Sequence, residues 1–154
     1  MDSLMDQTLI PRILISLVAV AISVGPMFAD FNKTHATNPA WTPHARFHVV
    51  WQVLCQTGVS LVVLYLLWAP SADPLTHIWL GASLTFIWGI SFYSTLASMS
   101  LFGGTLADVN GIKPFKFNIL GKVRLVDTNL FGGTILMSIN GVACYLLATI
   151  PHVG

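Results

Sequence analysis

Four long apolar stretches dominate the sequence and restrict its possible folds more than any motif does. They cover residues 9–29, 47–69, 75–101 and 130–150. A helix needs about 20 apolar residues to cross the roughly 30 Å of hydrocarbon in a bilayer, so each stretch is long enough to span one. Only 8% of the residues are charged, against about 25% in a typical soluble domain. We therefore predict an all-α, polytopic membrane four-helix bundle, with residues 1–154 forming a single integral membrane domain.

The basic residues predict how this bundle is oriented. Arg12 is the one Lys or Arg on the side of the second connection, and the other six lie on the side of the first and third connections: Lys33, Arg46, Lys113, Lys116, Lys122 and Arg124. Loops rich in Lys and Arg stay in the cytoplasm. The pattern predicts four spans with both termini on the exoplasmic or lumenal side. The net charge of +1 gives no indication of a nucleic-acid partner.

Polar and titratable side chains concentrate in one segment, between the first two stretches and at the start of the second. They are Asp30, Asn32, His35, Asn38, His44, Arg46, His48 and Gln52. Such groups are costly close to hydrocarbon, and a cluster of them at the mouth of a membrane span is a candidate functional site.

The second helix is expected to begin at Thr42-Pro43, as an N-cap followed by proline at the first helical position. At about 100° per residue, His44, His48 and Gln52 then fall within about 80° of one another, with Cys55 on the same face. This stripe extends about 12 Å inward from the interface. Lipid cannot form hydrogen bonds with these polar side chains, so we expect protein or water opposite the stripe. Both cysteines, Cys55 and Cys144, are expected to be small buried side chains rather than disulfide partners.

Our first interpretation is an enzyme that uses acid–base chemistry, without a cofactor, on a hydrophobic small molecule. A histidine near an aspartate at a partly dehydrated interface can exchange protons near neutral pH. We expect His48 to be the acid or base, with His44 beside it and Asp30 as its partner. Isomerisation, cyclisation, epoxide opening and oxygenation of an acidic carbon are reactions of this type.

Four further residues are candidates for binding that substrate. Gln52 and Asn140 would orient it, and Asn140 is expected to face the bundle interior because its amide is costly to bury. Lys122 or Arg124 would hold a carboxylate or phosphate group.

Two other interpretations stay open. Histidines at i and i+4, as in His44 and His48, form half of a metal site, so a divalent metal is the alternative cofactor. The remaining ligands would come from the same side of the membrane: Asp30, His35, Asp108 or Asp127. The chain could instead be a non-catalytic lipid-binding or accessory membrane protein, with its histidines and tryptophans as interfacial anchors. A homo-oligomer is compatible with each interpretation.

The third connection has a pattern of its own. Residues 112–125 mix apolar and basic residues, which is typical of an interfacial segment that rests on anionic headgroups. Asp127-Thr128-Asn129 then supplies an N-cap for the fourth helix.

Asn38-Pro39-Ala40-Trp41-Thr42-Pro43-His44-Ala45-Arg46-Phe47-His48 resembles a run found before the second helix in a family of small four-span membrane proteins. The resemblance covers residues 30–52 and implies a membrane bundle, without an activity to transfer. In architecture the chain also looks like small membrane tailoring enzymes of polyketide and terpenoid pathways, such as the anthrone-oxygenase type. That likeness implies a lipophilic substrate but is an analogy of fold alone.

Overall fold

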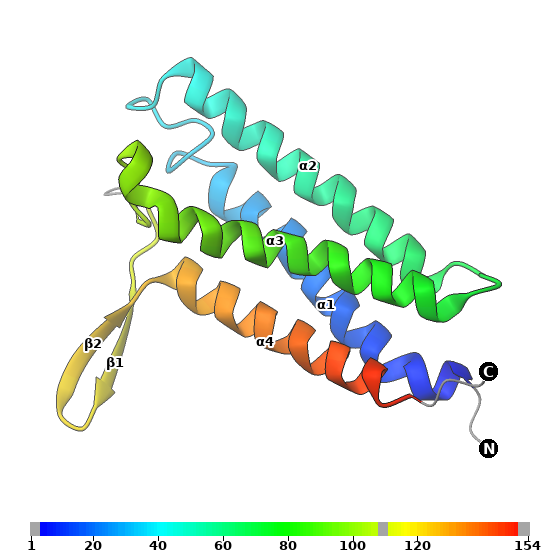
Figure 1. Cartoon of the computed structure of the whole chain (residues 1–154). Coiled ribbons are helices and arrows are strands. Elements are labelled where there is room, and N and C mark those ends of the chain that lie inside the picture. Colours follow the sequence, from blue (N-terminus) through cyan, green and yellow to red (C-terminus); the bar gives the residue numbers. More distant parts are fainter. Residues whose placement is uncertain (1–3, 108–110, 151–154) are drawn as a thin grey trace.

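Four helices and one β-hairpin form the part of the chain that the computed structural model describes, residues 4–107 and 111–150. Along the chain they are α1 (Leu4–Asp30), α2 (Pro43–Trp68), α3 (Pro74–Phe102), β1 (Phe115–Ile119), β2 (Lys122–Val126) and α4 (Thr128–Ala148). The helices lie side by side and alternate in direction (Figure 1). Each of the four is long and apolar enough to cross a membrane. The predicted fold class is confirmed, and the chain is an integral membrane four-helix bundle.

Side-chain caps determine where the helices begin. Thr42 accepts a hydrogen bond of 3.2 Å from the backbone nitrogen of Ala45, with Pro43 as the first residue of α2. Asp127 accepts hydrogen bonds of 2.8 and 3.1 Å from the nitrogens of Asn129 and Leu130 at the start of α4. Both caps are confirmed as the sequence predicts them, because a short oxygen-bearing side chain can satisfy the free N–H groups of a first helical turn.

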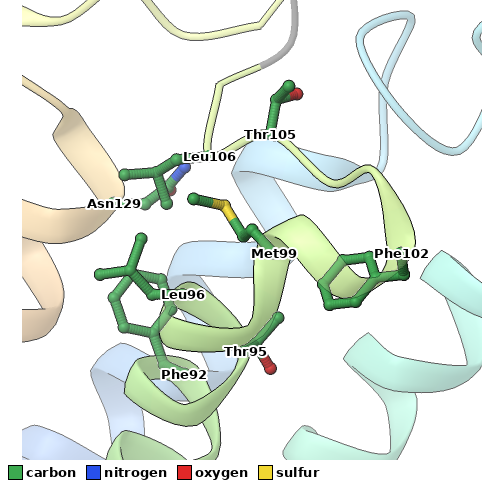
Figure 2. Close-up of a pocket in the computed structure, with 8 residues that line it drawn as sticks. All are labelled: Phe92, Thr95, Leu96, Met99, Phe102, Thr105, Leu106 and Asn129. Atoms are coloured by element: carbon green, nitrogen blue, oxygen red, sulfur yellow. The ribbon is translucent and has the colours of Figure 1, made fainter.

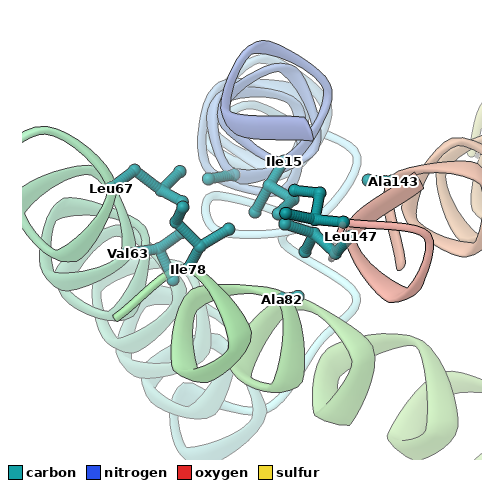
Figure 3. Packing of buried hydrophobic residues seen from close by; sticks show 9 residues of the cluster. Ile15, Val63, Leu67, Ile78, Ala82, Ala143 and Leu147 are labelled. Atoms are coloured by element: carbon teal, nitrogen blue, oxygen red, sulfur yellow. The ribbon is translucent and has the colours of Figure 1, made fainter. Parts of the chain in front are cut away.

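The apolar core lies toward the end of the bundle where α1 begins and α4 ends. Side chains from all four helices meet there, as Figure 3 shows. Gly81 on α3 helps this packing, since a Cβ at that position would lie 3.3 Å from Cδ2 of Leu67 on α2. The cluster consists of Ile15, Ala19, Val63, Leu67, Ile78, Ala82, Ala143, Leu147 and Ile150. The opposite end of the bundle, which carries the two long connections, holds the cavities described below.

The third connection contains a β-hairpin instead of an irregular loop. Strands β1 and β2 are antiparallel, with Phe117 opposite Arg124 and Ile119 opposite Lys122. The hairpin projects sideways from the bundle beside the start of α4 (Figure 1). Phe131 on α4 holds its base, with ring centroids 5.3 Å from Phe115 and 5.6 Å from Phe117.

Candidate functional site

Two adjoining cavities lie at the end of the bundle that carries the long connections. The larger, here the apolar cavity, has a volume of about 150 Å³ and lies between α3, the segment after it and the start of α4 (Figure 2). Its lining residues are Phe92, Thr95, Leu96, Met99, Phe102, Thr105, Leu106 and Asn129. A cavity of about this size, lined by apolar side chains, can hold a small aromatic molecule.

The smaller cavity, here the polar cavity, has a volume of about 50 Å³. Ala29, Asp30, His35, Leu106, Ala107, Gly111, Ile112 and Asn129 line it. Leu106 and Asn129 belong to both linings, so the two cavities are direct neighbours. A carboxylate and an imidazole therefore lie at one end of the combined site, and aromatic and aliphatic groups lie at the other.

Asp30 and His35 form the titratable pair of the polar cavity. Nδ1 of His35 lies 3.6 Å from Oδ1 of Asp30 and 2.7 Å from the hydroxyl oxygen of Thr34. The two side chains of the pair are 25% and 24% exposed, so both are partly shielded from water. The ring of Trp41 stands edge-on to His35, with a centroid distance of 5.0 Å.

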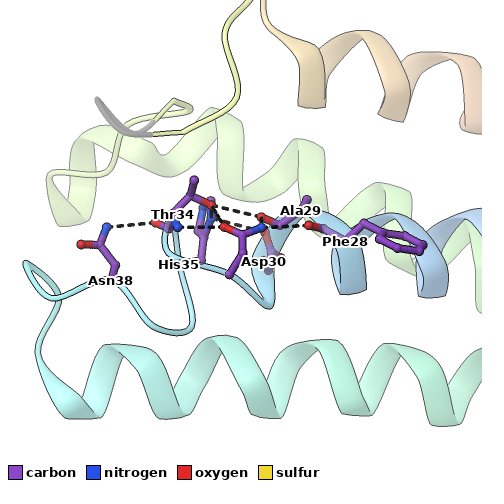
Figure 4. A network of polar contacts seen from close by, with 7 residues as sticks. Phe28, Ala29, Asp30, Thr34, His35 and Asn38 are labelled. Carbon is purple, nitrogen blue, oxygen red and sulfur yellow. Dashed lines mark hydrogen bonds and ion pairs between the residues drawn. The ribbon is translucent and has the colours of Figure 1, made fainter.

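Asn32 and Asn38 hold the connection that carries His35, and Figure 4 shows the bond between Asn38 and Thr34. Nδ2 of Asn32 donates to the carbonyl oxygens of Phe28 and Ala29, at 2.8 and 2.9 Å, and so satisfies two free carbonyls at the end of α1. Its Oδ1 accepts a hydrogen bond of 2.8 Å from the nitrogen of Thr34. The buried Asn38 donates to the carbonyl oxygen of Thr34 at 2.9 Å. These bonds hold His35 beside Asp30.

This geometry suits proton transfer by one specific ring nitrogen. Nδ1 of His35 is engaged by Thr34 and Asp30, so Nε2 is the nitrogen left to act on a bound molecule. The hydrogen bond between Thr34 and Nδ1 orients the ring, and the nearby carboxylate of Asp30 offsets the positive charge of an imidazolium formed at Nε2. Asn129, between the cavities, adds both a donor and an acceptor.

The structure places the other predicted catalytic residues apart from this pair. His44 and His48 contact each other, with their Nε2 atoms 3.0 Å apart, and both lie exposed on the outer face of α2. Among the described residues neither contacts a carboxylate. Asp30 thus has His35 as its partner, and a catalytic role for His48 stays a prediction.

The predicted substrate-binding residues do not line either cavity. Gln52 is exposed on the same face of α2 as the histidines. Asn140 is fully buried, as expected, and its Nδ2 donates a hydrogen bond of 3.1 Å to the carbonyl oxygen of Ala82 between α4 and α3. Lys122 and Arg124 are exposed on β2.

The predicted metal ligands do not gather around one point. Within residues 4–107 and 111–150, no three His, Cys, Asp or Glu side chains lie close enough to hold a metal ion. His35 is at the polar cavity and Asp127 caps α4, while His44 and His48 are on α2. Asp108, another predicted ligand, lies outside the described residues.

Sequence reasoning missed His35 as the partner of Asp30, and it missed the lining of the apolar cavity. The Asp30–His35 pair could have been found from the sequence, because the two residues are only five positions apart. The α3 side chains Phe92, Leu96 and Met99 carried no signal that separates them from lipid-facing residues, since both kinds are apolar.

A family described as a family of unknown function, DUF6640, matches residues 14–116. The matched segment contains α2, α3 and most of α1. The chain belongs to this family. The DUF6640 segment includes Asp30, His35 and every apolar lining residue contributed by α3, whereas Asn129 and α4 lie beyond it. No curated protein and no solved structure matches the chain.

Proposed function

We propose that this protein is an integral-membrane enzyme that moves protons on a hydrophobic small molecule. His35 acts as the acid or base through Nε2, and Asp30 stabilises its protonated form. One observation carries the proposal: the Asp30–His35 pair lines a polar cavity that shares Leu106 and Asn129 with an apolar cavity. This arrangement offers a place for a lipophilic group beside a proton donor and acceptor.

Isomerisation or cyclisation is the reaction class that fits these residues best. In either reaction His35 removes a proton from one atom of the substrate and returns it to another, so no further reactant is consumed. The apolar cavity of about 150 Å³ takes a ring or a short branched chain, and longer substrates extend into the bilayer. Asn129 would orient a carbonyl or hydroxyl group of the substrate between the two cavities.

We also propose that the site faces the cytoplasm and that both termini face the exoplasmic or lumenal side. Six of the seven Lys and Arg residues lie on the connections and helix ends at the site's end of the bundle, and Arg12 lies at the other end. That distribution follows the positive-inside rule.

The test begins with what the protein retains when it is purified from membranes. Organic extracts of the native protein and of Leu96→Trp, which fills the apolar cavity, are compared by mass spectrometry. Leu101→Trp is the matched control, because Leu101 is exposed on the same helix and lines neither cavity. We expect a hydrophobic molecule that the native protein and the control retain and Leu96→Trp loses.

The second step separates catalysis from binding. The retained molecule is incubated with the protein in deuterated buffer, where proton transfer through His35 replaces its labile hydrogens with deuterium. His35→Gln should keep the molecule but slow deuterium uptake by about 10²–10⁴-fold, and Asp30→Asn should slow it less. The His44→Gln variant, changed on the outer face of α2, should transfer deuterium to the molecule at the native rate. Retention without exchange by the native protein would instead identify a non-catalytic lipid-binding protein.

A further inference from the structure

The outer face of α2 carries a polar stripe that no other part of the described chain covers. His44, His48, Gln52 and Cys55 form this stripe, and all four are exposed. The sequence predicts protein or water opposite the stripe and a buried Cys55. The structure corrects the second expectation, because Cys55 faces outward. The helices that pack against α2, namely α1 and α3, lie on its other side, with Val53, Ser60 and Val63 buried among them.

Gln52 makes this exposure costly. It lies nine residues after Pro43, the first residue of α2, and hence about 14 Å along the helix axis. In a span that enters the bilayer at the start of α2, this depth is past the headgroup layer. Its side-chain amide makes no hydrogen bond to the described residues. Hydrocarbon offers no donor or acceptor, so an amide left facing lipid is unsatisfied.

A second copy of the same chain can cover this face and satisfy its polar groups. Two copies insert into the membrane in the same orientation, so a symmetric contact through α2 places the two Gln52 amides at the same depth. An amide carries donors and an acceptor, and two of them can therefore satisfy each other. Gly58 lies on the exposed side of α2 with no atom within 4 Å of a Cβ built there, which permits close helix approach.

We propose that the protein forms a parallel homodimer in the membrane through the polar stripe of α2, with Gln52 hydrogen-bonded across the contact. Cys55 then lies near the two-fold axis, since it falls between His44 and His48 on a helical wheel. The dimer places the His44–His48 pairs of both copies at one end of the contact. The cavity site is within each copy, so this proposal does not depend on the proposed function.

Cys55 is a native reporter for this contact. The full-length protein carrying Cys144→Ala, which leaves Cys55 as its single cysteine, is treated in isolated membranes with copper phenanthroline. We expect a covalent dimer. The control carries Cys144→Ala, Cys55→Ala and Ile87→Cys, because Ile87 is exposed near the middle of α3 but away from the stripe. That control measures crosslinking by random collision and should remain monomeric under the same treatment.

The role of Gln52 is tested by Gln52→Leu in the Cys144→Ala protein. Loss of the amide should weaken dimerisation by about tenfold, measured as the fraction crosslinked at decreasing protein-to-lipid ratios. Gln52 is exposed and its side chain makes no hydrogen bond within residues 4–107 and 111–150, so this variant should keep its folded yield. The proposal is overturned if Cys55 crosslinks no faster than the thiol of the Ile87→Cys control, or if Gln52→Leu crosslinks as well as the parent.

Discussion

Arg12, near the start of α1, donates a hydrogen bond from Nη1 to the backbone carbonyl oxygen of Leu67, in the last turn of α2. Its Nε donates at 3.1 Å to the hydroxyl oxygen of Thr8, and its guanidinium carbon lies 6.0 Å from the ring centre of Trp68. The side chain is only 5% exposed. The last carbonyls of a helix lack partners within it, and a cation near them is favourable. Arg12 therefore joins the two helix ends beside the apolar core.

Arg12→Leu should lower the free energy of unfolding by about 2 kcal/mol, because a buried hydrogen bond from a charged group is lost and the carbonyl of Leu67 is left without this donor. Unfolding in detergent micelles by titration with a denaturing detergent measures the change. Arg46→Leu is the control, since Arg46 lies on α2 outside this contact. Equal stability of Arg12→Leu and the native protein would contradict a structural role for the guanidinium.

Asn32→Ala should loosen the connection that carries His35 without unfolding the bundle. The variant loses the bonds from Asn32 to the carbonyls of Phe28 and Ala29, and the bonds that its Oδ1 accepts from Thr34. Hydrogen exchange followed by mass spectrometry should show faster exchange in residues 31–42 and native exchange in α3. Lys33→Ala changes an exposed neighbour and should leave both regions as they are. Native protection of residues 31–42 in Asn32→Ala would show that the backbone bonds suffice.

The N-cap of α3 should make stability depend on pH. Hydrogen bonds from Thr76 hold the pKa of Asp73 below its ordinary value, since they favour the charged carboxylate. A group whose pKa is lower in the folded state stabilises it above the pKa of the unfolded state. This contribution is lost as the pH falls through the folded pKa, below about pH 4.

Asp73→Ser tests this dependence, because serine retains an N-cap oxygen but does not titrate. The native protein should lose more thermal stability than Asp73→Ser when the pH is lowered from neutral to the acidic range. Asp73→Ala should melt at a lower temperature than either at neutral pH. Parallel pH curves for the native protein and Asp73→Ser would exclude Asp73 as the titrating group.

The sequence predicts well those features that are decided within one helix. Thr42 and Asp127 start helices in the structure because capping depends on the residues that follow directly in the chain. Asn140 is buried between helices because every position of a long span must face either lipid or protein, and an amide is costly in lipid.

Features that depend on contacts between segments are harder to predict. Helical periodicity shows that His44, His48 and Gln52 share a face, but the direction of that face depends on how α2 packs on α1 and α3. In the structure this face points away from α1 and α3. The pairing of Asp30 with His35 likewise depends on the hydrogen bonds of Asn32, which no periodic pattern reveals.

The hairpin also left a signal in the sequence. Apolar and polar residues alternate in residues 115–119 and again in residues 122–125, which is typical of strands. The connecting residues, Leu120 and Gly121, have φ angles of +52° and +76°. Two positive φ angles define the tight turn for which Asn-Gly is the usual sequence, and leucine in the first position conceals it.

Substitutions at these two neighbouring positions should therefore have opposite effects. Gly121→Val should destabilise the hairpin by about 1–2 kcal/mol, because a residue with a Cβ is strained at positive φ. Leu120→Asn should stabilise it, since asparagine tolerates this conformation and Leu120 is 98% exposed with no packing to lose. Hydrogen exchange in residues 115–126 measures both, with α3 as the internal reference. Faster exchange in both variants would mean that the Leu120 side chain, and not the turn geometry, holds the hairpin in place.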